Sequence, residues 1–396
     1  MRVQQQILGR WEVLERALGS IEAIFNEPAG AGSSEAGTIF NQSSGLGLSG
    51  SFSRFWNAWQ DLANVPESGA ARAVVRQEAD FLVTTMHQYN DKLRNTRSEL
   101  DADLVDEVAD INELLDQLAS INAEVPRASF DGGDASDLKD RRDLIIDELS
   151  RKVDITLTES ENGQLSVLSA GHNLLQGDSV VHLQVRQTVD SGTSVSRIHY
   201  ADDGSIASIS EGRLRGLIQV RDEVVPQLLT NIDEMAVGLV NEVNALHRTG
   251  FGQDAGTGVN FFDPEKTDAS NIALDDAILA SLSNIAASQD GNPGDNGMAL
   301  ALSSLRNGHI LAEGTRTMED FYYEMLGEIG AQSSEAQTMA ENHRLFSSQI
   351  ENRRQSVQGV SLNDEASQLI LFQRAYQAAA RTVSIIDELL EVTVNI

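Results

Sequence analysis

The chain has 396 residues, and its 29 Lys and Arg residues against 60 Asp and Glu residues give a formal net charge of −31 at pH 7. A surface this acidic repels phosphate groups, which argues against a protein that binds nucleic acid or anionic membranes. The chain contains no Cys, so disulfide bonds, thiolate metal sites and cysteine nucleophiles are excluded.

Helical periodicity dominates the first part of the chain. Residues 2–25 carry apolar side chains at spacings of three and four, which predicts one helix that ends before Pro28 and a Gly/Ser-rich stretch. Helices are also expected around 52–63 and at 138–149. Residues 70–125 contain neither Gly nor Pro, so we expect one very long helix or two with a slight break. Four carboxylates on this helix are interpreted as a solvated acidic face: Asp101, Asp103, Asp106 and Asp110.

The pattern changes to the alternation typical of strands between residues 153 and 210. These segments are rich in β-branched residues, and the Asn-Gly pair at 162–163 and the Asp-Gly pair at 203–204 are hairpin-type turn sequences. We therefore predict a small β-rich domain inserted between helices. The expected strands are 154–158, 165–168, 180–185 and 194–200.

Helical periodicity returns at 213–248, where Pro226 predicts a kink or break near Val225 because proline lacks the backbone N–H. Loops and short elements are expected at 250–305, and a long helix at 316–355. The fold class is therefore mainly α with a β-rich insertion, with long coiled-coil-like helices from both chain ends and a further mixed outer region. The expected domains are 1–150 (N-terminal half of a helical bundle), 151–211 (β-rich inserted domain), 212–355 (return of the bundle, with a mixed loop region at 250–310) and 356–396 (C-terminal assembly helix).

The C-terminal segment 361–396 contains neither Gly nor Pro, and apolar or small residues recur along it at alternating steps of four and three. This spacing is typical of a coiled-coil seam. Gln373 and Asp387 interrupt the seam, and such polar residues can fix the register of pairing. An ordinary amphipathic helix packed on its own domain would show the same spacing, so both interpretations stay open. The candidate partner-binding residues are Leu362, Ala366, Leu369, Gln373, Tyr376, Ala380, Val383, Asp387, Leu390 and Val394.

The sequence offers no positive sign of an enzyme. No two of its seven His residues have the His-x-x-x-His spacing of a helical zinc site, and neither a nucleophile elbow nor a phosphate-binding loop is present. We therefore expect no catalysis, no cofactor and no metal site. We also expect neither a cleaved secretion signal nor a membrane span, because no apolar run approaches the required length of about 18 residues.

Several stretches resemble bacterial flagellar proteins. Residues 373–381 read QRAYQAAAR, which is similar to the C-terminal helix of flagellar axial proteins, a group that includes rod, hook, hook-associated and filament proteins. Residues 212–217 (GRLRGL) and 240–250 (VNEVNALHRTG) resemble the middle of the hook-associated proteins at the hook–filament junction, the FlgK family. Residues 55–64 (FWNAWQDLAN) resemble the same family, as does the segment 138–143. The family normally opens with a small-residue, Asn-rich helix, and nothing similar precedes Arg2 here.

This resemblance implies a structural subunit that joins hook to filament by helical polymerisation through its terminal helices. It implies four kinds of partner: neighbouring copies in a helical array, the hook protein, the second hook–filament junction protein, and a cytoplasmic export chaperone on the C-terminal helix. It further implies export to the flagellum without a cleaved signal peptide, with neither nucleic-acid binding nor membrane insertion.

Two other classes of function stay open at this point. One is another flagellar axial protein of hook, rod or filament type, and residues 212–250 favour the junction protein over these. The other is an unrelated secreted coiled-coil binding protein, such as an effector or adhesin. A cell-wall hydrolase is the enzyme alternative.

Overall fold

The computed structural model describes residues 2–25, 47–130, 136–160, 163–190, 193–358 and 362–394. The chain divides into two units, Arg2–His343 and Arg344–Ile396. The first unit is described in this section. The second contains the C-terminal helix and is described with the candidate site. No helix in the described ranges is long and apolar enough to cross a membrane.

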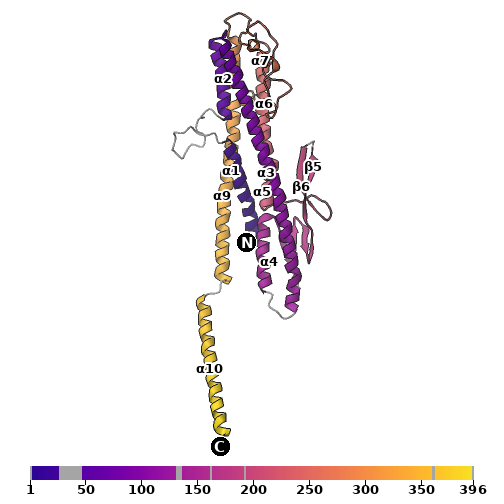
Figure 1. Ribbon diagram of the computed structural model, residues 1–396, viewed down its shortest axis with the longest axis vertical. Helices are drawn as coiled ribbons and strands as arrows, with labels where there is room; N and C mark the ends of the chain where they lie inside the picture. Colours follow the sequence, from indigo (N-terminus) through magenta and orange to yellow (C-terminus); the bar gives the residue numbers. More distant parts are fainter. Residues whose placement is uncertain are drawn as a thin grey trace. The chain divides into compact units, whose positions relative to one another are not determined.

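Four helices form the first part of the larger unit: α1 (Arg2–Phe25), α2 (Leu48–Asn64), α3 (Gly69–Phe130) and α4 (Ser136–Lys152) (Figure 1). The prediction of a very long helix is confirmed, because α3 is one continuous helix of 62 residues. At 1.5 Å per residue it is about 90 Å long. It continues past the expected end and contains Pro126. The fold class, mainly α with a β-rich insertion, is also confirmed.

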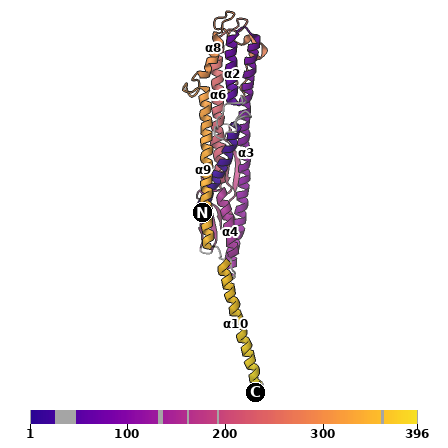
Figure 2. The same ribbon diagram turned by 90° about the vertical axis from the view of Figure 1, so that its left-hand side faces the viewer.

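The core lies along one face of α3. Its stripe of buried apolar residues includes Leu82, Met86, Leu93, Leu104 and Ile111, all fully buried. α3 packs against α2, α4 and α6 (Val225–His247), and Figure 2 shows α2, α6 and α3 running alongside one another. This arrangement explains the apolar spacing in the sequence, since each apolar turn of α3 faces another helix.

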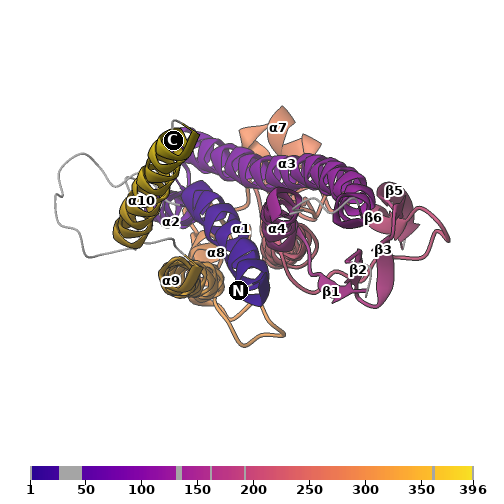
Figure 3. The same cartoon turned by 90° about the horizontal axis from the view of Figure 1, so that it is seen from below.

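The β-rich region lies on the side of the unit formed by α3 and α4 (Figure 3). An antiparallel sheet has the order β1-β2-β3-β4, and β5 and β6 pair as a separate antiparallel hairpin. The sequence analysis missed β3, and its expected strand 180–185 joins the end of β4 to the first residues of β5, which continues to Asp190. The strands are β1 (Thr156–Glu159), β2 (Leu165–Ser169), β3 (His172–Gln176), β4 (Ser179–Val180), β5 (Leu183–Asp190) and β6 (Thr193–Tyr200).

Two asparagines of α3 attach the strands to the helix. The side chain of buried Asn122 donates to the carbonyl oxygens of Leu165 (2.9 Å) and Gly177 (2.6 Å) and accepts from the backbone N–H of Leu165 (2.7 Å). Asn112 makes the equivalent pair of hydrogen bonds to the backbone of Leu183. Each amide side chain therefore replaces a neighbouring strand, which satisfies backbone groups that packing against a helix would otherwise leave unpaired.

The expected disturbance near Pro226 takes the form of a wider helical turn. Helix α5 (Arg213–Gln219) leads into the π-helical turn η1 (Val220–Val224), in which the N–H of Val225 donates to the carbonyl of Val220. α6 begins directly afterwards, with Pro226 in its first turn. A proline collides with the carbonyl four residues before it and cannot donate to it. The wider π-helical turn accommodates the proline, and the helical segment continues from α5 through η1 into α6.

Arg221 in this π-helical turn is a buried connection between the helices and the β hairpin. It is 3% exposed, and its guanidinium donates to Asp222, to Asp101 (2.6 Å) and to the carbonyl of Ser196 in β6 (2.7 Å). Burial alone would lower the pKa of Arg221, but the hydrogen bonds and charges of Asp222 and Asp101 raise it. The solvated acidic face is therefore wrong for Asp101, whereas Asp103, Asp106 and Asp110 are exposed as expected. Asp110 also pairs with Lys152 at 2.8 Å.

The motif at 212–217 has a local structural reason. Gly212 has a φ of +88°, which residues with a side chain rarely adopt, and its N–H donates to the carbonyl of Gln6 in α1. A Cβ atom at Gly216 would lie 2.8 Å from the carbonyl oxygen of Arg10. The two glycines therefore permit the close packing of α5 on α1.

Short elements follow α6 and enclose an aromatic cluster. Phe261 and Phe262 are fully buried and pack against Phe55 and Trp59 of α2. Asn244 of α6 holds this loop by hydrogen bonds to the backbone of both phenylalanines. The remaining elements are α7 (Asp276–Ala280), η2 (Leu282–Asn284), α8 (Gly297–Ser304), η3 (Leu305–Asn307) and α9 (Met318–Gln358).

Candidate assembly surface

The C-terminal segment forms the helix α10 (Leu362–Val394), which has 33 residues. The helix predicted for this segment is confirmed, and at 1.5 Å per residue it is about 50 Å long. All ten candidate partner-binding residues lie on this one helix.

The apolar side chains of α10 are exposed. Every residue from Ala366 to Leu390 is exposed, including Leu369 (58%), Tyr376 (78%) and Val383 (58%). The side chains of Leu362 and Val394 are not among those described. Soluble proteins rarely expose a contiguous apolar surface of this extent unless it binds a partner. α10 is therefore the part of the described chain with the strongest sign of an interaction surface.

The candidate residues follow one side of the helix. A helix advances about 100° per residue, so alternating steps of four and three keep successive residues within a narrow stripe. Gln373 and Asp387 lie on this stripe and are exposed like their apolar neighbours. We call this stripe the seam. That the seam contacts a partner remains a prediction.

The sequence analysis missed apolar residues of α10 outside the seam. Leu371 and Phe372 are 68% and 71% exposed, and Ile385 and Ile386 are 56% and 49% exposed. These apolar residues are visible in the sequence but lie outside the four-and-three spacing of the seam. α10 is thus apolar over much more of its circumference than one seam requires.

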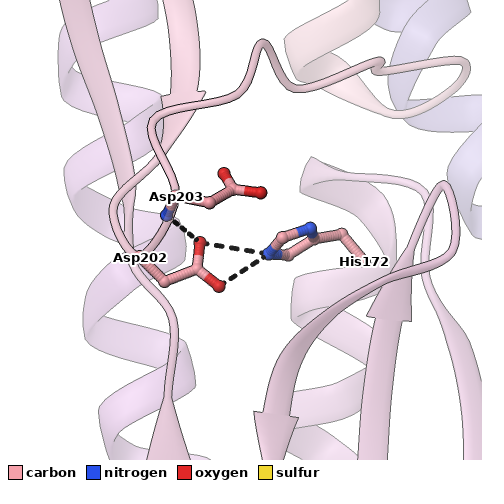
Figure 4. Close-up of side chains that lie close together, drawn as sticks. All are labelled: His172, Asp202 and Asp203. Carbon is pink, nitrogen blue, oxygen red and sulfur yellow. Dashed lines mark hydrogen bonds and ion pairs between the residues drawn. The ribbon is translucent and has the colours of Figure 1, made fainter.

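A second cluster of possible interest lies in the β-rich region (Figure 4). Nε2 of His172 is 3.0 and 3.1 Å from the two carboxylate oxygens of Asp202, and the imidazole stacks on the ring of Tyr200 at 3.8 Å. Asp203 accepts a hydrogen bond from the N–H of Ser205, which lowers the pKa of its carboxyl.

His172, Asp202 and Asp203 offer ligand atoms within 4.8 Å of one another. Among the residues that the structure describes, this is the one such group of three. Its internal hydrogen bonds already account for the arrangement: the imidazole joins β3 to the turn after β6. Sequence spacing could not indicate it, because His172 and Asp202 are 30 residues apart in the chain.

His247 of α6 is a buried titratable group with a structural partner for each ring nitrogen. His247 is 1% exposed. Its Nδ1 lies 2.8 Å from the carbonyl of Val259, and its Nε2 accepts the N–H of Ala286 at 2.9 Å. Burial lowers the pKa of His247 to about 4, so it is neutral at pH 7.

A groove of about 270 Å³ between α1, α6 and α9 is lined by apolar, amide and carboxylate side chains.

Two family models match the chain. Residues 33–262, more than half of the chain, match the flagellar hook-associated protein FlgK helical domain. The chain belongs to the FlgK family of flagellar hook-associated proteins. Residues 354–396, which include α10, match the model of the flagellar basal body rod FlgEFG protein C-terminal region.

Curated relatives extend the FlgK similarity along the chain. Flagellar hook-associated protein 1 of Bacillus subtilis (strain 168) is 30% identical over 430 residues, which cover 100% of this chain and 82% of the relative. The protein of the same name from Salmonella typhimurium is 22% identical, and the match covers 88% of this chain and 81% of the relative.

A solved structure supports the fold. The flagellar hook junction protein FlgK from Burkholderia pseudomallei superimposes with a TM-score of 0.76 and covers 91% of this chain and 99% of that one. At 14% identity, this likeness concerns the fold alone. The resemblance to the FlgK family found in the sequence is confirmed, and the matched ranges include residues 55–64, 212–217, 240–250 and 373–381.

Proposed function

We propose that the chain is a structural subunit of the bacterial flagellum, which joins hook to filament by polymerising through its terminal helices. The observation that carries this proposal is the exposed apolar surface of α10. It lies within the segment 354–396 that matches a flagellar axial protein, on a chain that is similar over its whole length to a flagellar hook-associated protein 1.

The physical properties of α10 suit a contact that forms during assembly. An isolated helix gains little stability from its own hydrogen bonds and depends on packing of its apolar face. A partner that covers the seam would therefore both bury apolar surface and stabilise the helix. A helical array needs head-to-tail contacts that do not close on themselves, and a long terminal helix can reach the next copy in such an array.

We propose four partners on the same basis. Neighbouring copies of the chain, the hook protein and the second hook–filament junction protein would contact the subunit in the assembled flagellum. A cytoplasmic export chaperone would cover α10 before export, because the exposed apolar surface would otherwise favour aggregation. We further propose export without a cleaved signal peptide, and a role that involves contact rather than catalysis.

Immunogold labelling of isolated flagella with an antibody against the chain tests this proposal. Label confined to a narrow zone between hook and filament would support the junction role. Label along the whole hook, rod or filament would instead assign the chain to another axial position. Flagella without label would contradict the proposal and favour a secreted binding protein with a coiled-coil tail.

A further inference from the structure

A second apolar stripe runs along α10. The residues two positions after successive members of the seam repeat the same alternating steps of four and three. Its three large members are exposed: Leu371 (68%), Leu389 (61%) and Ile385 (56%). Small residues lie between Leu371 and Ile385. The second stripe consists of Leu371, Ala375, Ala378, Thr382, Ile385 and Leu389.

The two stripes lie on opposite sides of the helix. A step of two residues corresponds to a rotation of about 200° at 100° per residue, and the same step separates every seam residue from its counterpart. A two-stranded coiled coil covers only one stripe of each helix. One partner on the seam would therefore leave the second stripe exposed to water.

Charged residues flank the second stripe on one side only. Arg374, Arg381 and Glu388 follow one another at steps of seven, so they line one margin of the stripe. Phe372, Ala379 and Ile386 line the other margin at the same spacing. In antiparallel coiled coils each margin faces the same margin of the partner helix, whereas in parallel coiled coils opposite margins meet.

An antiparallel pair of α10 helices matches these margins. When two copies are aligned about a centre near Ala380, Arg374 of each copy faces Glu388 of the other. On the second margin, Phe372 faces Ile386. A parallel pair would instead place the charged margin of one copy against the apolar margin of the other, which buries charge without a partner.

The stripe itself is also self-complementary in this orientation. Leu371 then faces Leu389, and Ile385 faces Ala375. Ala378 faces Thr382 at the centre, where small side chains permit the helices to approach closely. Arg381 of one copy faces Arg381 of the other, which is the one unfavourable contact. Because both side chains are exposed, solvent screening weakens this repulsion.

We propose that the second stripe binds the α10 helix of a second copy of this chain in an antiparallel, two-fold symmetric dimer. Such a contact is closed and cannot propagate, so it is distinct from the open head-to-tail array of the proposed function. It leaves the seam on the opposite side uncovered. The proposal depends on the stripe and its margins, and it holds whether or not the chain occupies the hook–filament junction.

Exchanging the charges of Arg374 and Glu388 in the purified full-length chain tests the antiparallel orientation of the two α10 helices. Arg374→Glu places two Glu pairs in the dimer, and Glu388→Arg places two Arg pairs there. Each single change should raise the dimer dissociation constant on the order of tenfold, because two weak attractions become repulsions. The double variant exchanges the charges and should restore dimerisation. The measurement is sedimentation equilibrium over a range of protein concentrations, with Gln377→Glu on the polar side of α10 as control.

A monomer at all concentrations would overturn the proposal, and so would a double variant that fails to recover while α10 remains helical by circular dichroism. Disulfide crosslinking gives an independent test, since the chain has no Cys of its own. A mixture of Phe372→Cys and Ile386→Cys chains should crosslink to each other, whereas neither variant alone should do so. Crosslinking of Leu371→Cys with itself would show a parallel pair, because Leu371 faces Leu389 in the antiparallel pair. Crosslinking of Val383→Cys alone would place the contact on the seam.

Discussion

Acidification should destabilise the larger unit through His247. The neutral imidazole uses both nitrogens in the folded chain, as a donor to the carbonyl of Val259 and as an acceptor for the N–H of Ala286. A proton on Nε2 would remove the second hydrogen bond and place a charge in a site that is 1% exposed. Its pKa is accordingly lowered from 6.5 to about 4.

The sign and size of the effect follow from this pKa. The unfolded chain binds the proton below about pH 6.5, and the folded chain only below about pH 4. The stabilisation by neutral His247 is therefore fully present above pH 6.5 and is lost as the pH falls toward 4. One pKa unit corresponds to about 1.4 kcal/mol, so between pH 7 and pH 5 the loss amounts to about 2 kcal/mol.

Urea unfolding at pH 7 and pH 5 measures this loss. Trp59 provides the signal, because its ring lies 6.1 Å from that of His247. Many carboxylates also titrate in this range, so wild type is compared with His247→Gln, which cannot titrate, and with His309→Gln at an exposed position. The free energy of unfolding of His247→Gln should fall by about 2 kcal/mol less than that of the other two proteins.

Equal losses in all three proteins would refute the reasoning. His247→Gln will itself be less stable at pH 7, because a buried hydrogen-bonding side chain is replaced. If that variant does not fold, the imidazole of the wild-type chain can be titrated directly by NMR. A His247 signal that titrates near pH 6.5 in the folded protein would contradict the neutral, buried state.

Three further predictions test other parts of the structure. Tyr376→Asp or Val383→Asp should prevent incorporation into flagella while the melting temperature of the larger unit stays unchanged; normal incorporation would show that the seam is not the contact surface. Arg221→Met should lower the free energy of unfolding by about 3 kcal/mol, because it leaves buried hydrogen-bond partners unpaired, and an unchanged urea midpoint would contradict this. Asn122→Ala should cost about 2–3 kcal/mol through lost buried hydrogen bonds and should accelerate proteolysis of the β-rich region, whereas exposed Gln117→Ala should do neither.

The long helices could be predicted from the sequence because each one buries a continuous stripe. In α3 the apolar spacing alone decides which face is covered, and Gly and Pro are absent over most of its length. Its true end could not be predicted, since the helix tolerates Pro126. The strand β3 was missed because His172–Gln176 has a buried pair, Leu174 and Leu175, in place of strict alternation.

Local sequence patterns could not predict the polar contacts between residues that are far apart in the chain. Asp101 looked like one of several solvated carboxylates, yet its partner Arg221 is 120 residues away in the chain. The same holds for Asn112 and Asn122, because an asparagine in a helix gives no local sign that it binds a strand. In the candidate site the limit is different: the spacing of the second stripe of α10 is present in the sequence, but spacing alone does not show that Leu371 and Ile385 are exposed.

The continuity of α3 has a mechanical consequence. One part of this helix packs on α2 beside the aromatic cluster, and a later part holds the strands through Asn112 and Asn122. Between residues 70 and 125 this helix contains neither Gly nor Pro, so over that length it bends gradually and offers no hinge. A force applied at the aromatic cluster is therefore transmitted along one continuous helix to the β-rich region. The larger unit should respond to torque as one stiff body, so elastic deformation under rotation would be concentrated outside α3.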